Sequence, residues 1–147
     1  SVYDVFLNDD PDRAFLHSHS FTANPLACAV ALRSLEIFEE NDTLAKVKHI
    51  ERRHKDFLET LQATHTIYMP RVMGAILAFN LADNDGAYKN NKGEFLREYF
   101  FQNGLNIRPI GNAVYLMPPY CITDEQMDRA YAGILKGLEL LAQKQAA

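Results

Sequence analysis

The 147-residue sequence has little of what marks several classes of protein. Its two cysteines, Cys28 and Cys121, cannot form a disulfide framework or a four-cysteine zinc site. Its 7 glycines and 6 prolines are too few for a collagen-like or low-complexity chain. A net charge of −4 argues against general binding to nucleic acid or anionic membranes, which needs a basic field. The longest apolar stretch, residues 25–32, is too short to span a membrane.

Several enzyme motifs are also missing. The sequence has no glycine-rich nucleotide loop, no Gly-x-Ser-x-Gly elbow and no Cys-x-x-Cys. All seven lysines lie in polar contexts, so none is predicted to be a desolvated amine that forms a Schiff base. The chain begins at Ser1 without a basic stretch ahead of an apolar one. We therefore expect no signal peptide. Two cysteines without a disulfide framework favour a cytoplasmic location, and a start at serine rather than methionine indicates a fragment or a processed product.

What is present indicates one globular domain, with 48% apolar residues. Periodicity and turn residues predict, in order, helices over 24–40 and 43–62, strands over 64–72 and 75–81, a helix over 94–102, strands over 105–109 and 113–117, and a last helix to 141. We expect each pair of strands to form an antiparallel hairpin. This order predicts an α+β fold, a short and mostly antiparallel sheet with helices packed on one face.

The predicted helices carry clear start signals and apolar stripes. Asn24 followed by Pro25 is a strong helix start, and Thr123 with Gln126 forms a capping box. Apolar residues on nearly every face predict that the first half of the first helix is buried. The stripe predicted for the second helix contains Leu44, Val47, Ile50, His54, Phe57, Leu58 and Leu61. The stripe predicted for the last helix contains Met127, Ala130, Tyr131, Ile134, Leu138 and Leu141.

The densest polar cluster, residues 17–20, lies just ahead of the first helix. Its histidines and serines near free helix N–H groups suit an anion such as phosphate, although an ordinary polar loop has the same composition. His17 and His19 could also be half of a metal site, but no third ligand follows at usable spacing.

Arg108 is the second candidate site residue, because it lies in an apolar context on a predicted strand. A guanidinium held there can bind a carboxylate or phosphate, and it can equally pair with a surface acid. Tyr115, across the predicted hairpin, either shares this site or is an aromatic at the edge of the core. We interpret His49, His54 and His65 as helix-surface or turn residues, since nothing pairs them with a nucleophile.

Two segments resemble the class III pyridoxal-phosphate aminotransferases. FLHSHSFTANPLACA, residues 15–29, is similar to the segment that follows the cofactor lysine in that family. IRPIGNAVYLMPPY, residues 107–120, is more specific. It resembles those members that transfer an amino group from S-adenosylmethionine to 8-amino-7-oxononanoate in biotin biosynthesis. The resemblance covers essentially the whole chain but only the C-terminal part of the family's sequence.

The resemblance implies a fold type I enzyme, in which a large domain binds pyridoxal 5'-phosphate and a smaller C-terminal α+β domain closes over the site. Residues 1–30 would belong to the large domain or bridge from it, and residues 31–147 would form the small domain. The Schiff-base lysine would lie upstream of Ser1, so this chain would hold no catalytic residue and be inactive alone, without bound cofactor.

Four residues near the first helix acquire expected roles from the resemblance. Ser20 stands where the family usually has threonine and would bind the cofactor phosphate of the neighbouring subunit in a homodimer. His19, beside it, is a second candidate for cofactor binding. Ser18 replaces a usual glycine near the substrate, so a backbone contact there is in doubt. Ala23 also replaces a common glycine, an exchange that we expect to cost little.

On the second segment, Arg108 matches the arginine that binds the carboxylate of the amino acceptor, and Tyr115 matches an aromatic close to the substrate. Three alternatives stay open. The chain could derive from another class III aminotransferase acting on ornithine, a diamine or an ω-amino acid. It could be a non-catalytic α+β binding module, or a metal-binding domain that uses His17 and His19. We also expect apolar area around residues 27–32 to be exposed in the isolated chain, favouring association.

Overall fold

The computed structural model describes residues 3–7, 10–13, 20–82 and 91–146. The chain forms two compact units, Ser1–Asn41 and Asp42–Ala147, which are treated separately here. The predicted division at residue 30 stays a prediction. The helices and strands are α1 (Pro25–Glu40), α2 (Thr43–Thr64), β1 (Tyr68–Met73), β2 (Ile76–Asn80), α3 (Asn91–Gln102), β3 (Ala113–Leu116) and α4 (Asp124–Ala146). Two short 3-10 turns, Tyr3–Val5 and Pro11–Arg13, precede them.

The first unit contains α1, which begins where its capping residues predict. The side-chain oxygen of Asn24 accepts a hydrogen bond from the Ala27 N–H at 3.1 Å, and Pro25 takes the first helical position. No residue of α1 is buried, so the predicted burial of its first half is wrong for this chain. An apolar helix is buried only if other surfaces cover it, and the described residues supply no such cover.

The second unit is built on a three-stranded antiparallel sheet in the order β1-β2-β3. Met73 pairs with Ile76 around a two-residue turn, which confirms the first predicted hairpin. The second predicted hairpin is wrong, because residues 105–109 form no strand and only Ile110 bridges to Ala113. Pro109 has no N–H to donate to a ladder, whereas β2 offers β3 a continuous edge, with Ala78 opposite Tyr115.

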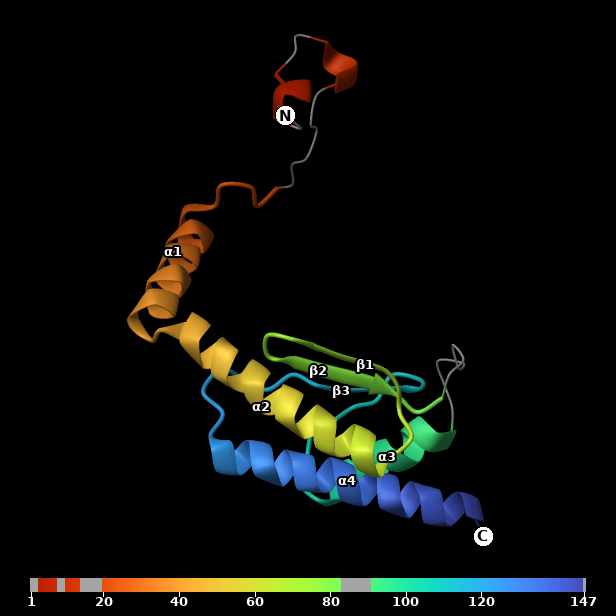
Figure 1. The fold of residues 1–147 in the computed structure, drawn as a ribbon. Helices are drawn as coiled ribbons and strands as arrows, with labels where there is room; N and C mark the ends of the chain where they lie inside the picture. Colours follow the sequence, from red (N-terminus) through yellow and green to blue (C-terminus); the bar gives the residue numbers. More distant parts are fainter. Residues whose placement is uncertain (1–2, 8–9, 14–19, 83–90, 147) are drawn as a thin grey trace. The chain divides into compact units, whose positions relative to one another are not determined.

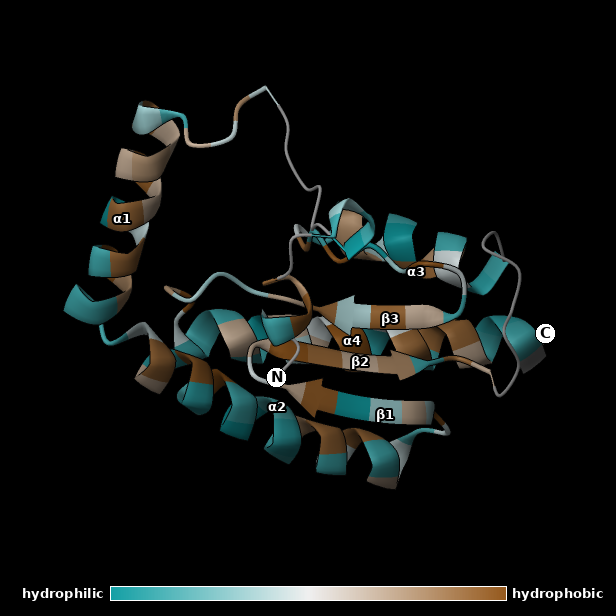
Figure 2. Cartoon of the chain, turned by 90° about the horizontal axis from the view of Figure 1, so that it is seen from above, coloured by the Kyte–Doolittle hydropathy of each residue, from teal (hydrophilic) through white to brown (hydrophobic). Residues whose placement is uncertain are grey.

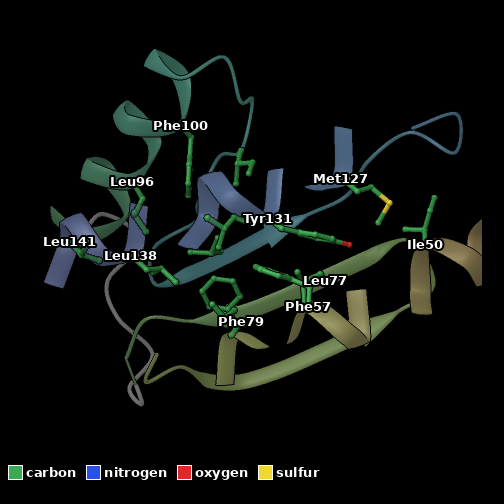
Figure 3. Packing of buried hydrophobic residues seen from close by; sticks show 14 of the residues in the cluster. Ile50, Phe57, Leu77, Phe79, Leu96, Phe100, Met127, Tyr131, Leu138 and Leu141 are labelled. Carbon is green, nitrogen blue, oxygen red and sulfur yellow. The ribbon is translucent and has the colours of Figure 1, made fainter. Parts of the chain in front are cut away.

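The helices of this unit cover one face of the sheet, as predicted for an α+β fold. Figures 1 and 2 show α4 beneath β2, α2 along β1 and α3 on the β3 side. Side chains from all three helices converge on the strands (Figure 3). Leu77, Phe79 and Val114 are each 1% exposed, so alternate residues of β2 and β3 face the helices.

The stripe predicted for α4 is confirmed at all six positions, which are buried. The Thr123 N–H donates to the Gln126 side chain at 3.0 Å, and the Gln126 N–H donates to the Thr123 hydroxyl at 3.3 Å, so the capping box is present. On α2 the stripe residues Ile50, His54, Phe57 and Leu61 are buried and Leu58 is partly buried, but Leu44 in the first turn is 67% exposed. In the described parts of the chain, no helix has the length and apolar character that crossing a membrane requires.

Candidate functional site

The predicted cofactor-binding residues lie in the first unit. Ser18 and His19 fall outside the described residues, so their roles stay predictions. Ser20 is exposed at the start of a turn, residues 20–23, that leads into α1. Ala23 closes this turn with φ 57°, in the left-handed region that favours glycine. The expectation that alanine costs little here is therefore wrong, since its Cβ adds roughly 1 kcal/mol of strain.

The predicted metal site cannot be assessed at His17 and His19, which lie outside the described residues. Within the ranges that the structure does describe, no three or more His, Cys, Asp or Glu side chains gather to hold a metal ion.

Two turns position Arg108 and Tyr115 in the second unit. At the end of α3, Gly104 adopts φ 71°, and the Leu105 N–H donates to the Phe100 carbonyl at 2.8 Å, which reverses the chain. Further on, Ile110 and Ala113 exchange two backbone hydrogen bonds of 2.9 Å around a tight turn that leads into β3. The segment carrying Arg108 is thus held at both ends although it belongs to no strand.

Arg108 is exposed and lines a hollow together with Arg97 and Phe101. Its guanidinium has no hydrogen-bond or ion-pair partner among the described residues, although Glu98 lines the same hollow. Of the two interpretations that the sequence left open, a surface ion pair is therefore not formed within the described part of the chain. A guanidinium in this position, beside apolar side chains, can donate hydrogen bonds to the carboxylate of a ligand.

Tyr115 occupies a different surface. Its neighbours on β3, Val114 and Leu116, point toward the core, so Tyr115 projects from the face that the helices leave open. The register places it beside Ala78, which is in turn beside Arg71. Tyr115 is half-buried and is not among the residues that line the hollow of Arg108. Substrate contact by either residue stays a prediction.

His54 does not lie on the helix surface. The interpretation of it as a helix-surface residue is therefore wrong, and its place on the apolar stripe of α2 is confirmed. It is 0% exposed, its Nδ1 lies 2.8 Å from the Tyr131 hydroxyl, and its Nε2 lies 3.2 Å from the Ala75 carbonyl oxygen. Burial lowers the pKa of His54, partly opposed by the hydrogen bond to Ala75. This buried contact joins α2, α4 and the turn between β1 and β2.

His49 is exposed on α2, and His65 is half-buried at the C-cap of that helix, which agrees with the helix-surface and turn positions predicted for them. The Nε2 atom of His49 lies 2.7 Å from a carboxylate oxygen of Asp124, and Arg53 contacts both Asp124 and Asp128. The hydrogen bond from His49 lowers the pKa of Asp124. These contacts tie α2 to the first turn of α4 at the surface, where ion pairs contribute little to stability.

Sequence reasoning did not single out Arg97, which lies on α3 and lines the same hollow as Arg108. One signal was available. Gly104, between the two arginines, predicts a reversal of the chain after α3, and a reversal returns the following residues alongside the last turns of the helix. Without that reversal, a spacing of eleven residues does not predict that the two arginines lie close together.

Known proteins resemble this chain over most of its length. The family described as Aminotransferase class-III matches residues 1–138. An adenosylmethionine-8-amino-7-oxononanoate aminotransferase of Synechococcus elongatus is 39% identical over 90% of the chain, which covers 31% of that protein. A Helicobacter pylori protein of the same name is 34% identical over 90% of the chain, which covers 30% of it. A rice protein named probable gamma-aminobutyrate transaminase 4 is 28% identical over 85% of the chain and is covered to 28%.

The chain therefore spans about 30% of the length of the curated relatives it matches. Among solved structures, an amine transaminase from an uncultivated Pseudomonas species, in its PLP-bound form, superposes with a TM-score of 0.78. The match covers 93% of this chain and 32% of that one at 19% identity. A likeness at this identity shows the fold alone, a portion of a fold type I transaminase.

Proposed function

Because the chain belongs to the class III aminotransferases, we propose that it forms part of an enzyme that transfers the amino group of S-adenosylmethionine to 8-amino-7-oxononanoate, giving 7,8-diaminononanoate for biotin biosynthesis. The observation that carries this proposal is the 39% identity to the Synechococcus elongatus protein of that name, sustained over 90% of the chain. The chain covers less than a third of that relative, so the activity is assigned to the longer protein.

The role proposed for Arg108 is to hold the carboxylate of the keto acid. Its guanidinium is exposed and has no partner within the described ranges, so it can bind a carboxylate with two parallel hydrogen bonds, which fixes orientation as well as affinity. Orienting the acceptor in this way lowers the entropic part of the barrier for the reacting carbonyl. Tyr115, half-buried on β3, and Ser18 are proposed as further substrate contacts.

Pyridoxal 5'-phosphate is the cofactor proposed for the longer protein, and when bound it supplies the electron sink for amino transfer. The residues present fit part of its site. Ser20 presents an exposed hydroxyl ahead of α1, suited to a phosphate oxygen of the cofactor in the other subunit of a proposed homodimer, with His19 beside it. The Schiff-base amine is proposed to belong to the part of the longer protein that this chain does not cover.

The test uses the whole gene product, purified with every residue that its gene encodes. We would record its visible absorption before and after adding S-adenosylmethionine. An absorption band of bound pyridoxal phosphate that bleaches with this donor supports the proposal. No band after reconstitution with the cofactor would reject the enzyme assignment, and the 147-residue chain alone is expected to show no band and no activity.

A second candidate is an aminotransferase that uses an ω-amino acid, a diamine or ornithine, and it is favoured by the 28% identity to the rice protein. The same spectra separate the two candidates. A band that ignores S-adenosylmethionine and bleaches with γ-aminobutyrate or ornithine would keep the family and change the donor. In either case, Arg108→Ala is expected to raise the KM for the keto-acid acceptor more than it lowers kcat, because the guanidinium binds a part of the substrate remote from the reacting carbon.

A further inference from the structure

We infer that Arg97 and Arg108 together form a binding site for the carboxylate end of an aliphatic acid, with Phe101 and Leu105 contacting its methylene chain. This inference rests on the proposed function, because it names a second residue and a ligand class for the carboxylate site assigned to Arg108. Arg97 has no role in the resemblance on which Arg108 was chosen.

The backbone brings the two arginines to one hollow. Arg97 lies on α3, one helical turn before Phe101, and the two side chains therefore share a face of the helix. Beyond Gly104 the chain turns back, held by the hydrogen bond from the Leu105 N–H to the Phe100 carbonyl at 2.8 Å. Residues 105–108 consequently form the opposite wall of the hollow that α3 lines.

Both guanidiniums are exposed and lack a hydrogen-bond or ion-pair partner among the described residues. Other arginines of the chain are engaged, such as Arg53 with two aspartates and Arg129 with the Asn103 carbonyl oxygen. The one carboxylate on the hollow, that of Glu98, accepts a hydrogen bond from the Gln102 amide at 2.7 Å. Two positive charges against one negative leave the hollow with a net charge suited to a single carboxylate.

The remaining lining indicates what the carboxylate is attached to. Phe101 is 75% exposed and lines the hollow together with both arginines. Leu105 adds a partly exposed apolar side chain on the other side of the hollow, where Ile107 is only 5% exposed. A ligand with a charged head and a methylene chain satisfies both kinds of surface, whereas phosphate or a sugar phosphate would leave the apolar side chains in water.

The experiment follows backbone amide shifts of the isotopically labelled 147-residue chain during titration with heptanoate, with acetate and phosphate as comparison ligands. Heptanoate is expected to bind in the millimolar range, to shift amides of residues 97–108, and to bind more tightly than acetate or phosphate. Arg97→Gln and Arg108→Gln are each expected to weaken heptanoate binding roughly three- to tenfold. Arg97→Lys keeps the positive charge but loses the paired N–H donors of the guanidinium. Its affinity for heptanoate is expected to lie between those of wild type and Arg97→Gln.

Arg52→Gln is the matched control, because Arg52 is exposed on α2 and does not line the hollow. It removes the same charge and is expected to leave heptanoate affinity unchanged. Equal losses in Arg97→Gln and Arg52→Gln would overturn the inference by reducing it to net charge. Heptanoate binding no tighter than that of phosphate would overturn the assignment to an aliphatic acid.

The inference and the proposed function fail differently. Heptanoate binding that depends on Arg97 would stand even if the whole gene product ignored S-adenosylmethionine, because no donor enters the titration. An active gene product whose KM for the keto acid is the same in Arg97→Gln as in wild type would keep the proposed function and remove Arg97 from the site. The KM is the decisive readout, since a purely structural role of Arg97 would also lower kcat and stability.

Discussion

Buried His54 has one neutral tautomer that satisfies both of its ring nitrogens. The Ala75 carbonyl can only accept, so Nε2 carries the proton and donates across 3.2 Å. Nδ1 then accepts from the Tyr131 hydroxyl at 2.8 Å. Burial raises the pKa of Tyr131, which keeps this hydroxyl a donor. A second proton on His54 would make Nδ1 a donor, so the Tyr131 hydroxyl would have to accept from it and would lose the acceptor of its own proton.

Replacing Tyr131 by phenylalanine removes the donor and leaves Nδ1 of His54 buried and unpaired. We expect Tyr131→Phe to lower the free energy of unfolding by about 1 to 3 kcal/mol, the usual cost of an unsatisfied buried polar group. Denaturant unfolding measures it. Tyr68→Phe is the matched control, since the Tyr68 side chain is only half-buried. Equal effects of the two variants would show that the hydroxyl contact contributes nothing specific.

The lowered pKa of His54 predicts a pH dependence of stability. Between that lowered pKa and the ordinary value of 6.5, the unfolded chain binds a proton that the folded chain does not. The stabilisation is fully present above pH 6.5 and is lost as the pH falls from there through the lowered pKa. Denaturation midpoints measured from pH 7.5 downward test this. His54→Gln is expected to flatten the dependence of the denaturation midpoint on pH. A dependence that is unchanged in His54→Gln but flattened in His65→Gln would contradict the assignment to His54.

At this scale the sequence predicted the position of His54 but not its environment. Its spacing with Ile50, Phe57 and Leu61 placed it on the buried stripe of α2, and the general tendency of histidine to be exposed argued the other way. The partner that decides between them, Tyr131, lies 77 residues later. Local periodicity contains no information about such a contact. For the same reason, the sequence could not predict whether Arg108 pairs with an acidic side chain among the described residues.

At the scale of elements, positions whose signals are local were predicted well. The cap at Asn24 and the capping box at Thr123 each depend on a few adjacent residues. The second hairpin failed because strand pairing is a choice between competing edges. β3 pairs with β2, more than thirty residues away in sequence, in preference to the segment ending at Pro109.

The reversal at Gly104 is the element on which the proposed carboxylate site depends. Gly104→Ala is expected to destabilise the chain by roughly 1 to 2 kcal/mol, because φ 71° disfavours alanine and its Cβ would lie 2.8 Å from the Arg129 guanidinium. Gly104→Asn meets the same guanidinium but tolerates the left-handed conformation. Thermal unfolding should therefore rank wild type, Gly104→Asn and Gly104→Ala in falling order. An equal loss in both variants would trace the effect to crowding against Arg129 instead of backbone strain.

At the scale of the whole molecule, the two units differ in how much of their apolar surface they bury. The second unit encloses a core formed by α2, α3, α4 and the sheet (Figure 3). In the first unit, α1 carries apolar residues along its length (Figure 2) and buries none of them. Its large exposed side chains are Leu26, Val30, Leu32, Leu35, Ile37 and Phe38. This agrees with the expectation that residues 27–32 present apolar area in the isolated chain.

Exposed apolar area of this extent favours association, because each large side chain removed from water contributes about 1.5 to 3 kcal/mol. We expect the 147-residue chain to sediment as a concentration-dependent mixture rather than as a monomer. Val30→Glu, together with Leu26→Gln, keeps helix-forming residues on α1 and is expected to shift the distribution toward monomer. The control, Met69→Gln, removes an exposed apolar side chain of the second unit, one that is 61% exposed. If both variants dissociate the chain equally, general surface hydrophobicity drives association. If neither does, α1 remains exposed in water, and its apolar side chains do not provide the interface.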